Sequence, residues 1–147
     1  MSHPRLTASQ LNDYARRVPF NLWLDLQVVA IDAEGAELLV PWREELGGAR
    51  ETGHVHGGVL ACLADAAAGL SVMAAVGHGG PTVDMRVDFQ RGAVAGALRA
   101  RGRVQRAGRT LVFVDVEIRD ARDEVVTSGR AVSYVGSSRQ FQPAGAG

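Results

Sequence analysis

The residue with the clearest chemical potential is Asp65. Apart from Asp65 and Ser71, residues 59–76 are apolar, and their Ala and Leu content predicts a helix. Asp65 lies too far inside that helix to cap its N-terminus. A carboxylate in such a place is expected to be desolvated, and it then needs a partner or a catalytic task. The structural alternative is an aspartate at an exposed edge of the helix, or one paired with an arginine.

Two glycines, Gly57 and Gly58, precede the apolar segment. The first N–H groups of a helix have no acceptor within it, so they can bind an anion or the oxyanion of a reacting carbonyl. A tight turn into the helix is the structural alternative. His54 and His56 flank the glycines, and we expect His56 to hold the loop or to hydrogen-bond near the carbonyl. The sequence predicts no metal site, because Cys62 is the single cysteine and no further ligand lies at a useful spacing.

The spacing of Gly57 and Asp65 limits how they can cooperate. They are 65 − 57 = 8 residues apart, which is ~12 Å along one helix. A polarised carbonyl and the group that attacks it must lie within ~3 Å of each other. Two antiparallel copies of the helix could place Gly57 of one beside Asp65 of the other. If this is an active site, the spacing predicts a two-fold homodimer with two shared sites.

The charged residues balance, with 16 Lys+Arg and 16 Asp+Glu, and every basic residue is arginine. The neutral balance argues against a general nucleic-acid-binding protein. Residues 86–109 contain seven arginines and a single acid. One interpretation is cross-strand pairing of Arg99, Arg101 and Arg103 with Asp115 and Glu117. The other is a seat for the phosphates of a ligand such as coenzyme A, for which the candidates are Arg91, Arg103, Arg106 and Arg109.

The elements that position these residues follow from periodicity and turn signals. A helix is expected over residues 7–18, with Ser9 as its N-cap and Pro19 limiting it, and residues 42–55 are expected to form a loop. The segment 77–81, rich in glycine and ending in proline, should end the long helix. The expected strands cover residues 24–33, 36–41, 82–90, 97–106, 110–119 and 125–135.

This order predicts an α+β fold in which an antiparallel sheet wraps around one long central helix. A helix that is apolar on all faces must be enclosed, and only a curved sheet can enclose it here. We expect one domain over residues 1–136 and a disordered tail over 137–147. Alternation over residues 111–119 predicts one fully apolar strand face, formed by Val112, Val114, Val116 and Ile118.

The long apolar segment approaches the length of a membrane span, but a carboxylate near its centre would cost ~2.5–3.5 kcal/mol on insertion. A helix buried inside protein is therefore expected, with no membrane partner. Residues 1–11 contain no apolar run typical of a signal peptide. A cytoplasmic location is expected.

Four motifs in order carry a family resemblance: His56-Gly57-Gly58, Leu63-Ala64-Asp65, Thr82-Val83-Asp84-Met85 and Gly108-Arg109-Thr110-Leu111. Together they resemble the hotdog-fold thioesterases of the phenylacetate-degradation (PaaI-like) group, and the similarity runs over residues 24–135. The resemblance implies hydrolysis of an acyl-CoA thioester without a cofactor. It also implies a homodimer or a dimer of dimers.

The resemblance also implies residue roles. Asp65 matches the general base or nucleophile, and Gly57 matches the backbone N–H that polarises the thioester carbonyl. His56 matches the histidine beside it, and Thr82 matches a hydroxyl residue that helps to place the water. Gly58 and Arg50 are expected to contact substrate. Arg50 is a departure, because some members carry an amide residue seven positions before the glycine.

Two alternatives from other functional classes remain open. One is a hotdog dehydratase or hydratase, which would want a catalytic histidine paired with an acid in a different arrangement. The other is a non-catalytic module that binds acyl-CoA. The acyl group is unknown, and we expect Leu60, Leu63 and Met73 to contribute to the pocket walls.

Overall fold

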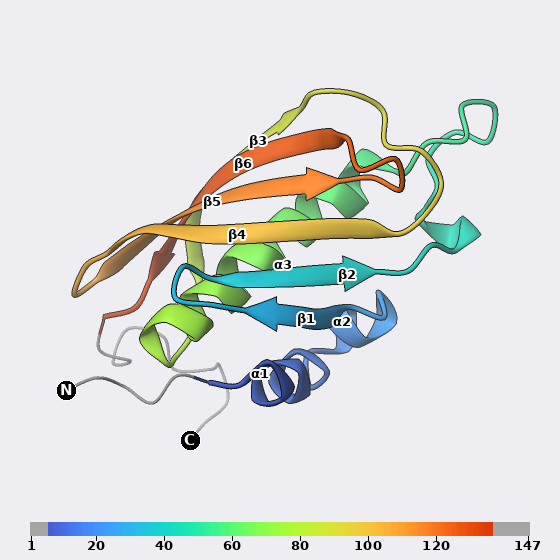
Figure 1. Ribbon diagram of the computed structural model, residues 1–147. Coiled ribbons are helices and arrows are strands. Elements are labelled where there is room, and N and C mark those ends of the chain that lie inside the picture. Colours follow the sequence, from blue (N-terminus) through green and yellow to red (C-terminus); the bar gives the residue numbers. More distant parts are fainter. Residues whose placement is uncertain (1–5, 137–147) are drawn as a thin grey trace, which may run out of the picture.

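The computed structural model describes residues 6–136, which form a six-stranded antiparallel sheet with one long helix against its inner face (Figure 1). The long helix is α3, Gly57–Val76. This is the α+β hotdog architecture expected from the sequence. The tail predicted over residues 137–147 lies outside the described residues.

The N-terminal segment forms two short helices, α1 (Ala8–Ala15) and α2 (Pro19–Trp23). The prediction of Ser9 as N-cap is wrong. Thr7 caps α1 in a reciprocal capping box with Gln10, whose backbone N–H donates to Thr7 Oγ1 at 3.2 Å. Pro19 begins α2, because its missing N–H and fixed φ suit the first position of a helix.

The strands follow the predicted order, with shorter ends at the first hairpin. The sheet order is β1-β2-β4-β5-β6-β3, so β1 and β3 are its two edges. A short 3₁₀ turn, η1 (Glu44–Leu46), interrupts the loop predicted between β2 and α3. The strands are β1 (Gln27–Ile31), β2 (Ala36–Val40), β3 (Thr82–Phe89), β4 (Leu98–Ala107), β5 (Leu111–Arg119) and β6 (Val125–Tyr134).

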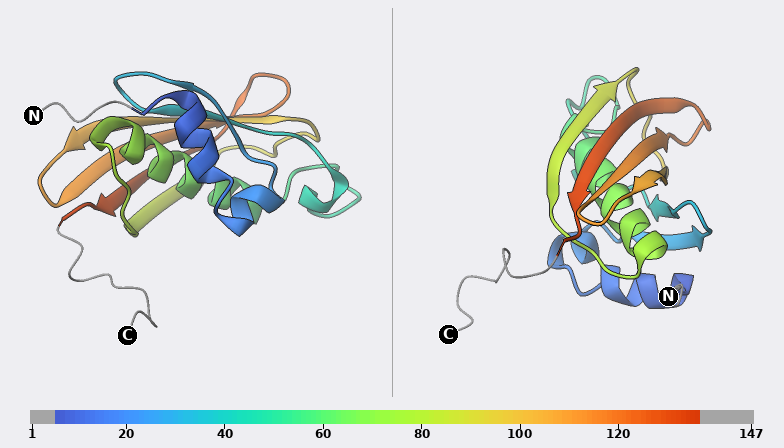
Figure 2. Two further views of the ribbon diagram at one scale, coloured as in Figure 1. Left: turned by 90° about the horizontal axis from the view of Figure 1, so that it is seen from below. Right: turned by 90° about the vertical axis from the view of Figure 1, so that its left-hand side faces the viewer.

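The sheet curves around α3, as the end-on view in Figure 2 shows. The predicted apolar face of β5 is confirmed: Val112, Val114 and Ile118 are fully buried and Val116 nearly so. Ser71 fixes the helix to the sheet, since its Oγ accepts the backbone N–H of Ala36 at 3.0 Å. These contacts set the rotation of α3 about its axis, and therefore which side chains face away from the sheet.

Full enclosure of α3 is not observed. The helix buries the side that carries Leu63 and Ala67, and it leaves a stripe on the opposite side less covered, with Gly58 and Asp65 exposed. α3 is long and apolar enough by composition alone to cross a membrane, but more than half of its most apolar stretch is buried inside the domain.

Candidate active site

His56 caps the start of α3. Its Nδ1 accepts the backbone N–H of Gly58 at 2.8 Å, and its backbone is extended, with φ −63° and ψ 133°. A ring nitrogen that accepts carries no proton, so the neutral imidazole holds its proton on Nε2. His56 thus caps α3 through Gly58, and its expected role beside a reacting carbonyl stays a prediction.

This cap changes what the two glycines can offer. The N–H of Gly58 is already bonded to His56, so Gly58 is not a free donor for a substrate oxygen. Gly57 is the first residue of α3, and its N–H has no acceptor within the helix. A Cβ at Gly57 would lie 3.7 Å from the ring of Phe89, an ordinary contact. Only the Gly57 amide therefore remains as an oxyanion donor at this end of the helix.

Asp65 lies on the side of α3 that faces away from the sheet, and Thr82 holds it there. Thr82 Oγ1, from the first residue of β3, donates to Asp65 Oδ1 at 2.6 Å. The expected desolvation is not observed within a single chain, because Asp65 is exposed, as the structural alternative had it. No ion pair reaches Asp65 from any residue between 6 and 136. The Asp65 carboxylate is therefore held by the Thr82 hydroxyl, and no cationic side chain among residues 6–136 neutralises its charge.

One chain does not bring the oxyanion donor and the carboxylate together. Gly57 and Asp65 lie on one uninterrupted helix, ~12 Å apart along its axis. β3 runs beside the helix so that Phe89 lies near Gly57 and Thr82 lies at Asp65. One end of β3 therefore lies near Gly57 and the other at Asp65.

A groove of about 380 Å³ opens beside Asp65 on the same side of α3. Its lining from the N-terminal segment was not expected, and of the three predicted pocket-wall residues only Met73 lines it. Leu60 and Leu63, also expected as pocket walls, are instead buried in the core at 3% and 0% exposure. The aromatic residues Tyr14 and Phe20 in the N-terminal segment were the sequence signal that could have indicated this part of the groove. The lining of the groove includes Tyr14 and Phe20 from the N-terminal segment, Asp65, Gly69 and Met73 from α3, and Thr82 from β3.

The candidate phosphate-binding arginines do not form one cluster. Arg91 follows β3 and pairs with Glu124 at 2.6 Å, whereas Arg103 in β4 pairs with Glu34 at 3.7 Å. Arg106 and Arg109 are exposed at the β4–β5 hairpin. Arg50 is exposed in the loop before α3. The structure therefore distributes the five predicted arginines over separate parts of the surface.

The predicted pairing of Arg99, Arg101 and Arg103 with Asp115 and Glu117 is wrong. The expected acids, Asp115 and Glu117, pair with Arg130 and Arg119, each at 2.8 Å. Arg99, Arg101 and Arg103 instead pair with acids of the β1–β2 hairpin: Glu37, Asp32 and Glu34. The reason is that β4 lies between β2 and β5, so its side chains reach the acids of either neighbour.

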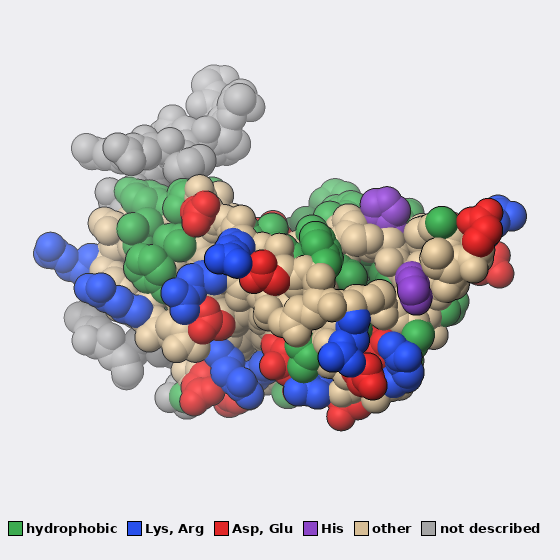
Figure 3. Space-filling view, turned by 90° about the horizontal axis from the view of Figure 1, so that it is seen from above, with side chains coloured by type: hydrophobic (Ala, Val, Ile, Leu, Met, Phe, Trp, Pro, Cys, Tyr) green, Lys and Arg blue, Asp and Glu red, His purple; other side chains and the backbone are tan. Residues whose placement is uncertain are grey.

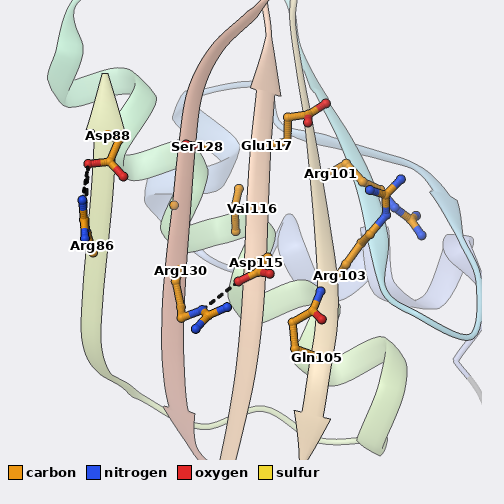
Figure 4. Close-up of a pocket in the computed structure, with 11 residues that line it drawn as sticks. Arg86, Asp88, Arg101, Arg103, Gln105, Asp115, Val116, Glu117, Ser128 and Arg130 are labelled. Atoms are coloured by element: carbon orange, nitrogen blue, oxygen red, sulfur yellow. Dashed lines mark hydrogen bonds and ion pairs between the residues drawn. The ribbon is translucent and has the colours of Figure 1, made fainter. Parts of the chain in front are cut away.

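The outer face of the sheet carries a groove of about 510 Å³ whose lining includes the charged residues Arg101, Arg103, Asp115 and Glu117 (Figure 4). Within it, Arg130 pairs with Asp115, and Arg86 pairs with Asp88 at 3.2 Å. Arg130 consequently has a raised pKa because of its hydrogen bond to Asp115. Figure 3 shows basic and acidic side chains interspersed on the surface seen from above. The charges of the side chains that line the groove on the outer face of the sheet are therefore mostly compensated by ion pairs.

The comparison with known proteins decides the family. A family model described as "Thioesterase superfamily" matches residues 52–127, which include Gly57, Asp65 and Thr82. The chain belongs to the thioesterase superfamily. That membership supports a thioesterase-type function for the chain.

Solved structures of thioesterase superfamily proteins share the fold over most of the chain. One X-ray structure is 38% identical and covers 87% of this chain and 97% of that chain, with a TM-score of 0.84. A protein of Shewanella oneidensis related to the superfamily is 25% identical over 88% of this chain and 95% of its own, with a TM-score of 0.79. A protein of Saccharolobus solfataricus named "putative esterase" is 27% identical over 100 residues, covering 67% of this chain and 70% of its own.

Proposed function

We propose that this thioesterase superfamily protein is an acyl-CoA thioesterase of the PaaI-like group, with Asp65 as its catalytic carboxylate. The observation that carries the proposal is the 2.6 Å hydrogen bond from Thr82 to Asp65 on the open side of α3, where both residues line a groove. A solvated carboxylate held in one orientation and free of cations suits a base or nucleophile better than a structural ion pair.

The active form is a homodimer in which each site uses both chains. β3 is an edge strand, and Val83 and Phe89 on it are 53% and 55% exposed. Edge strands pair readily with another strand. If β3 pairs antiparallel with β3 of a second copy, Thr82 of one chain approaches Phe89 of the other. Asp65 of one chain then approaches Gly57 of the other, which supplies the donor that its own chain holds ~12 Å away.

In this site the thioester carbonyl oxygen accepts the N–H of Gly57, which stabilises the negative charge that develops there. Asp65 takes a proton from a water molecule as the water oxygen attacks the carbonyl carbon. The carbon–sulfur bond then breaks, the sulfur of coenzyme A takes the proton that Asp65 had accepted, and a carboxylic acid is released. The alternative route is direct attack by Asp65 on the carbonyl carbon, which expels the thiolate of coenzyme A and gives a mixed anhydride; water then hydrolyses the anhydride, which releases the carboxylic acid and restores Asp65.

The remaining residues position these groups. Thr82 fixes one carboxylate oxygen, which leaves the other to accept from water. His56 holds the start of α3 and so the direction of the Gly57 amide. Exposed arginines, among them Arg106 and Arg109, contact the phosphates of coenzyme A. The protein acts in the cytoplasm, where it meets acyl-CoA.

The test is a hydrolysis assay over a panel of acyl-CoA thioesters, with sedimentation of the same preparation. Turnover by a dimer, or by a dimer of dimers, supports the proposal. Ligand binding without turnover would favour a non-catalytic acyl-CoA-binding module, and hydration of an unsaturated acyl-CoA would favour a hydratase. Turnover by a monomer would remove the shared site.

A further inference from the structure

The groove beside Asp65 is lined in part by Gly69, a glycine that packing within the chain does not require. Gly69 lies four residues after Asp65 on α3, hence on the same side of the helix. A Cβ at Gly69 would meet nothing within 4 Å. At Gly102, by contrast, a Cβ would clash with Ser71. Packing within the chain therefore requires glycine at position 102 but not at position 69.

Glycine at position 69 also weakens the helix that contains it. It is among the least favourable residues in a helix interior, because it loses the most backbone entropy on folding. Any small side chain would fit there and would stabilise α3. What glycine preserves is empty space over the helix between Asp65 and Met73, both of which line the groove.

Two aromatic residues of the N-terminal segment also line the groove, and one of them stacks on a neighbouring ring. Tyr14 and Phe20 line the groove and are 43% and 49% exposed. Phe20 stacks on Trp23 with ring centroids 5.9 Å apart and an interplanar angle of 18°. The guanidinium of Arg43 lies 4.2 Å from the centroid of the Trp23 ring. Trp23 therefore holds the ring of Phe20, which lines the groove.

We propose that this groove holds the acyl group of the thioester, and that Gly69 and Phe20 determine which acyl groups fit. The inference rests on the proposed function, since Asp65 and Thr82 at one end of the groove fix where the carbonyl lies. The acyl group then extends over Gly69 towards Met73, a distance of ~12 Å along α3. Its walls select an apolar acyl group longer than acetyl.

The experiment replaces Gly69 by leucine in the full chain and compares kcat/KM for acetyl-CoA and octanoyl-CoA. The matched control is Ala75→Leu, which adds a leucine at an exposed position of α3 outside the groove. Gly69→Leu is expected to raise Tm by a few degrees, because leucine favours the helix. It is expected to lower kcat/KM for octanoyl-CoA by at least ~10-fold, since the added side chain occupies acyl space.

Hydrolysis of the acetyl thioester should change less than about threefold, and Ala75→Leu should change neither substrate. Phe20→Ala should shift the preference the opposite way, towards bulkier acyl groups. An unchanged substrate ratio in Gly69→Leu, an equal loss for both substrates, or dissociation of its oligomer would overturn the inference while leaving the proposed function standing. A wild-type chain that hydrolyses no member of a broad panel would overturn both.

Discussion

Thr82 Oγ1 donates a hydrogen bond of 2.6 Å to Asp65 Oδ1, which ties the start of β3 to the middle of α3. The two residues are 17 positions apart in the sequence. Their contact fixes the Asp65 carboxylate relative to β3, which is an edge strand of the sheet.

Asp65→Asn should remove most of the activity. The amide keeps the size of the side chain, but it cannot take a proton from water or attack readily. We expect kcat to fall by at least ~10²-fold, the lower range for loss of a general base. The fold should survive because Asp65 is exposed and has no ion pair to lose within the described chain. Asp65→Glu should keep partial activity. Steady-state kinetics on the folded variants, checked by circular dichroism, give the answer.

Thr82→Val tests the positioning hydrogen bond. Valine keeps the β-branched shape that suits β3 but cannot donate to Asp65. We expect kcat to fall about tenfold, the rate equivalent of losing ~1.4 kcal/mol from a charge-assisted hydrogen bond. Thr82→Ser retains the hydroxyl and should recover most of the rate. Equal activity of the serine and valine variants would show that the hydroxyl is unimportant.

Arg106→Gln and Arg109→Gln test the contact with coenzyme A. Both arginines are exposed, and no ion pair within residues 6–136 engages them. Replacing a residue that contacts phosphate should raise KM more than it lowers kcat, because such contacts are similar in the ground and transition states. Arg99→Gln, which breaks a pair with Glu37 on the sheet, is the control. An unchanged KM for these variants and for those at Arg91 and Arg103 would assign all four to the solvated surface.

Asp120 should be a pH-dependent contributor to stability. It is 4% exposed and accepts the backbone N–H groups of Val94 and Arg122 at 3.2 and 3.0 Å. Burial raises the pKa of Asp120, but these bonds and the Arg122 side chain outweigh it, and the net pKa lies below its ordinary value. The stabilisation is therefore fully present above the unfolded-state pKa of ~3.9 and is lost as the pH falls through the lower folded-state pKa.

Asp120→Asn should accordingly cost ~1–3 kcal/mol in the free energy of unfolding at pH 7. The difference from wild type should shrink as the pH falls below ~4. Urea unfolding at several pH values measures this. Asp123→Asn is the control, because the Asp123 side chain is 82% exposed and asparagine tolerates its positive φ of 60°. A difference that does not vary with pH would contradict the assignment.

The sequence predicted much of the fold because its signals were local. The alternation in β5 and the glycine and proline residues that follow α3 need no tertiary information. α2 was missed because Pro19 was interpreted as the end of a helix, whereas it begins one. The acids that pair with Arg101 and Arg103 depended on the order of strands in the sheet, which periodicity does not provide.

Asp65, Gly57, Thr82 and His56 could be named from the sequence as candidate residues, but their surroundings could not be predicted. The structure joins Thr82 to Asp65 and His56 to Gly58, and the roles of these residues in a reaction stay predictions. Which side of α3 lies open depends on how Ser71 and its neighbours dock on the sheet, and the sequence shows only that every side is apolar. The hydrogen bond from the Gly58 amide to His56 depends on the rotamer of the His56 side chain, which the sequence does not show.

The central claim is that Asp65 of one chain works with Gly57 of another, and mixed dimers test it most directly. Gly57→Pro removes the N–H donor with little expected strain. Proline suits the first position of a helix, and the extended backbone of His56 suits a residue before proline. The Gly57→Pro and Asp65→Asn proteins should each be folded, dimeric and nearly inactive.

When the two proteins are unfolded together and refolded as an equal mixture, half of the dimers carry one intact site. We predict recovery of about one quarter of wild-type activity from the mixture. A mixture no more active than its two components, in which mixed dimers are nevertheless found by mass spectrometry, would contradict the shared site.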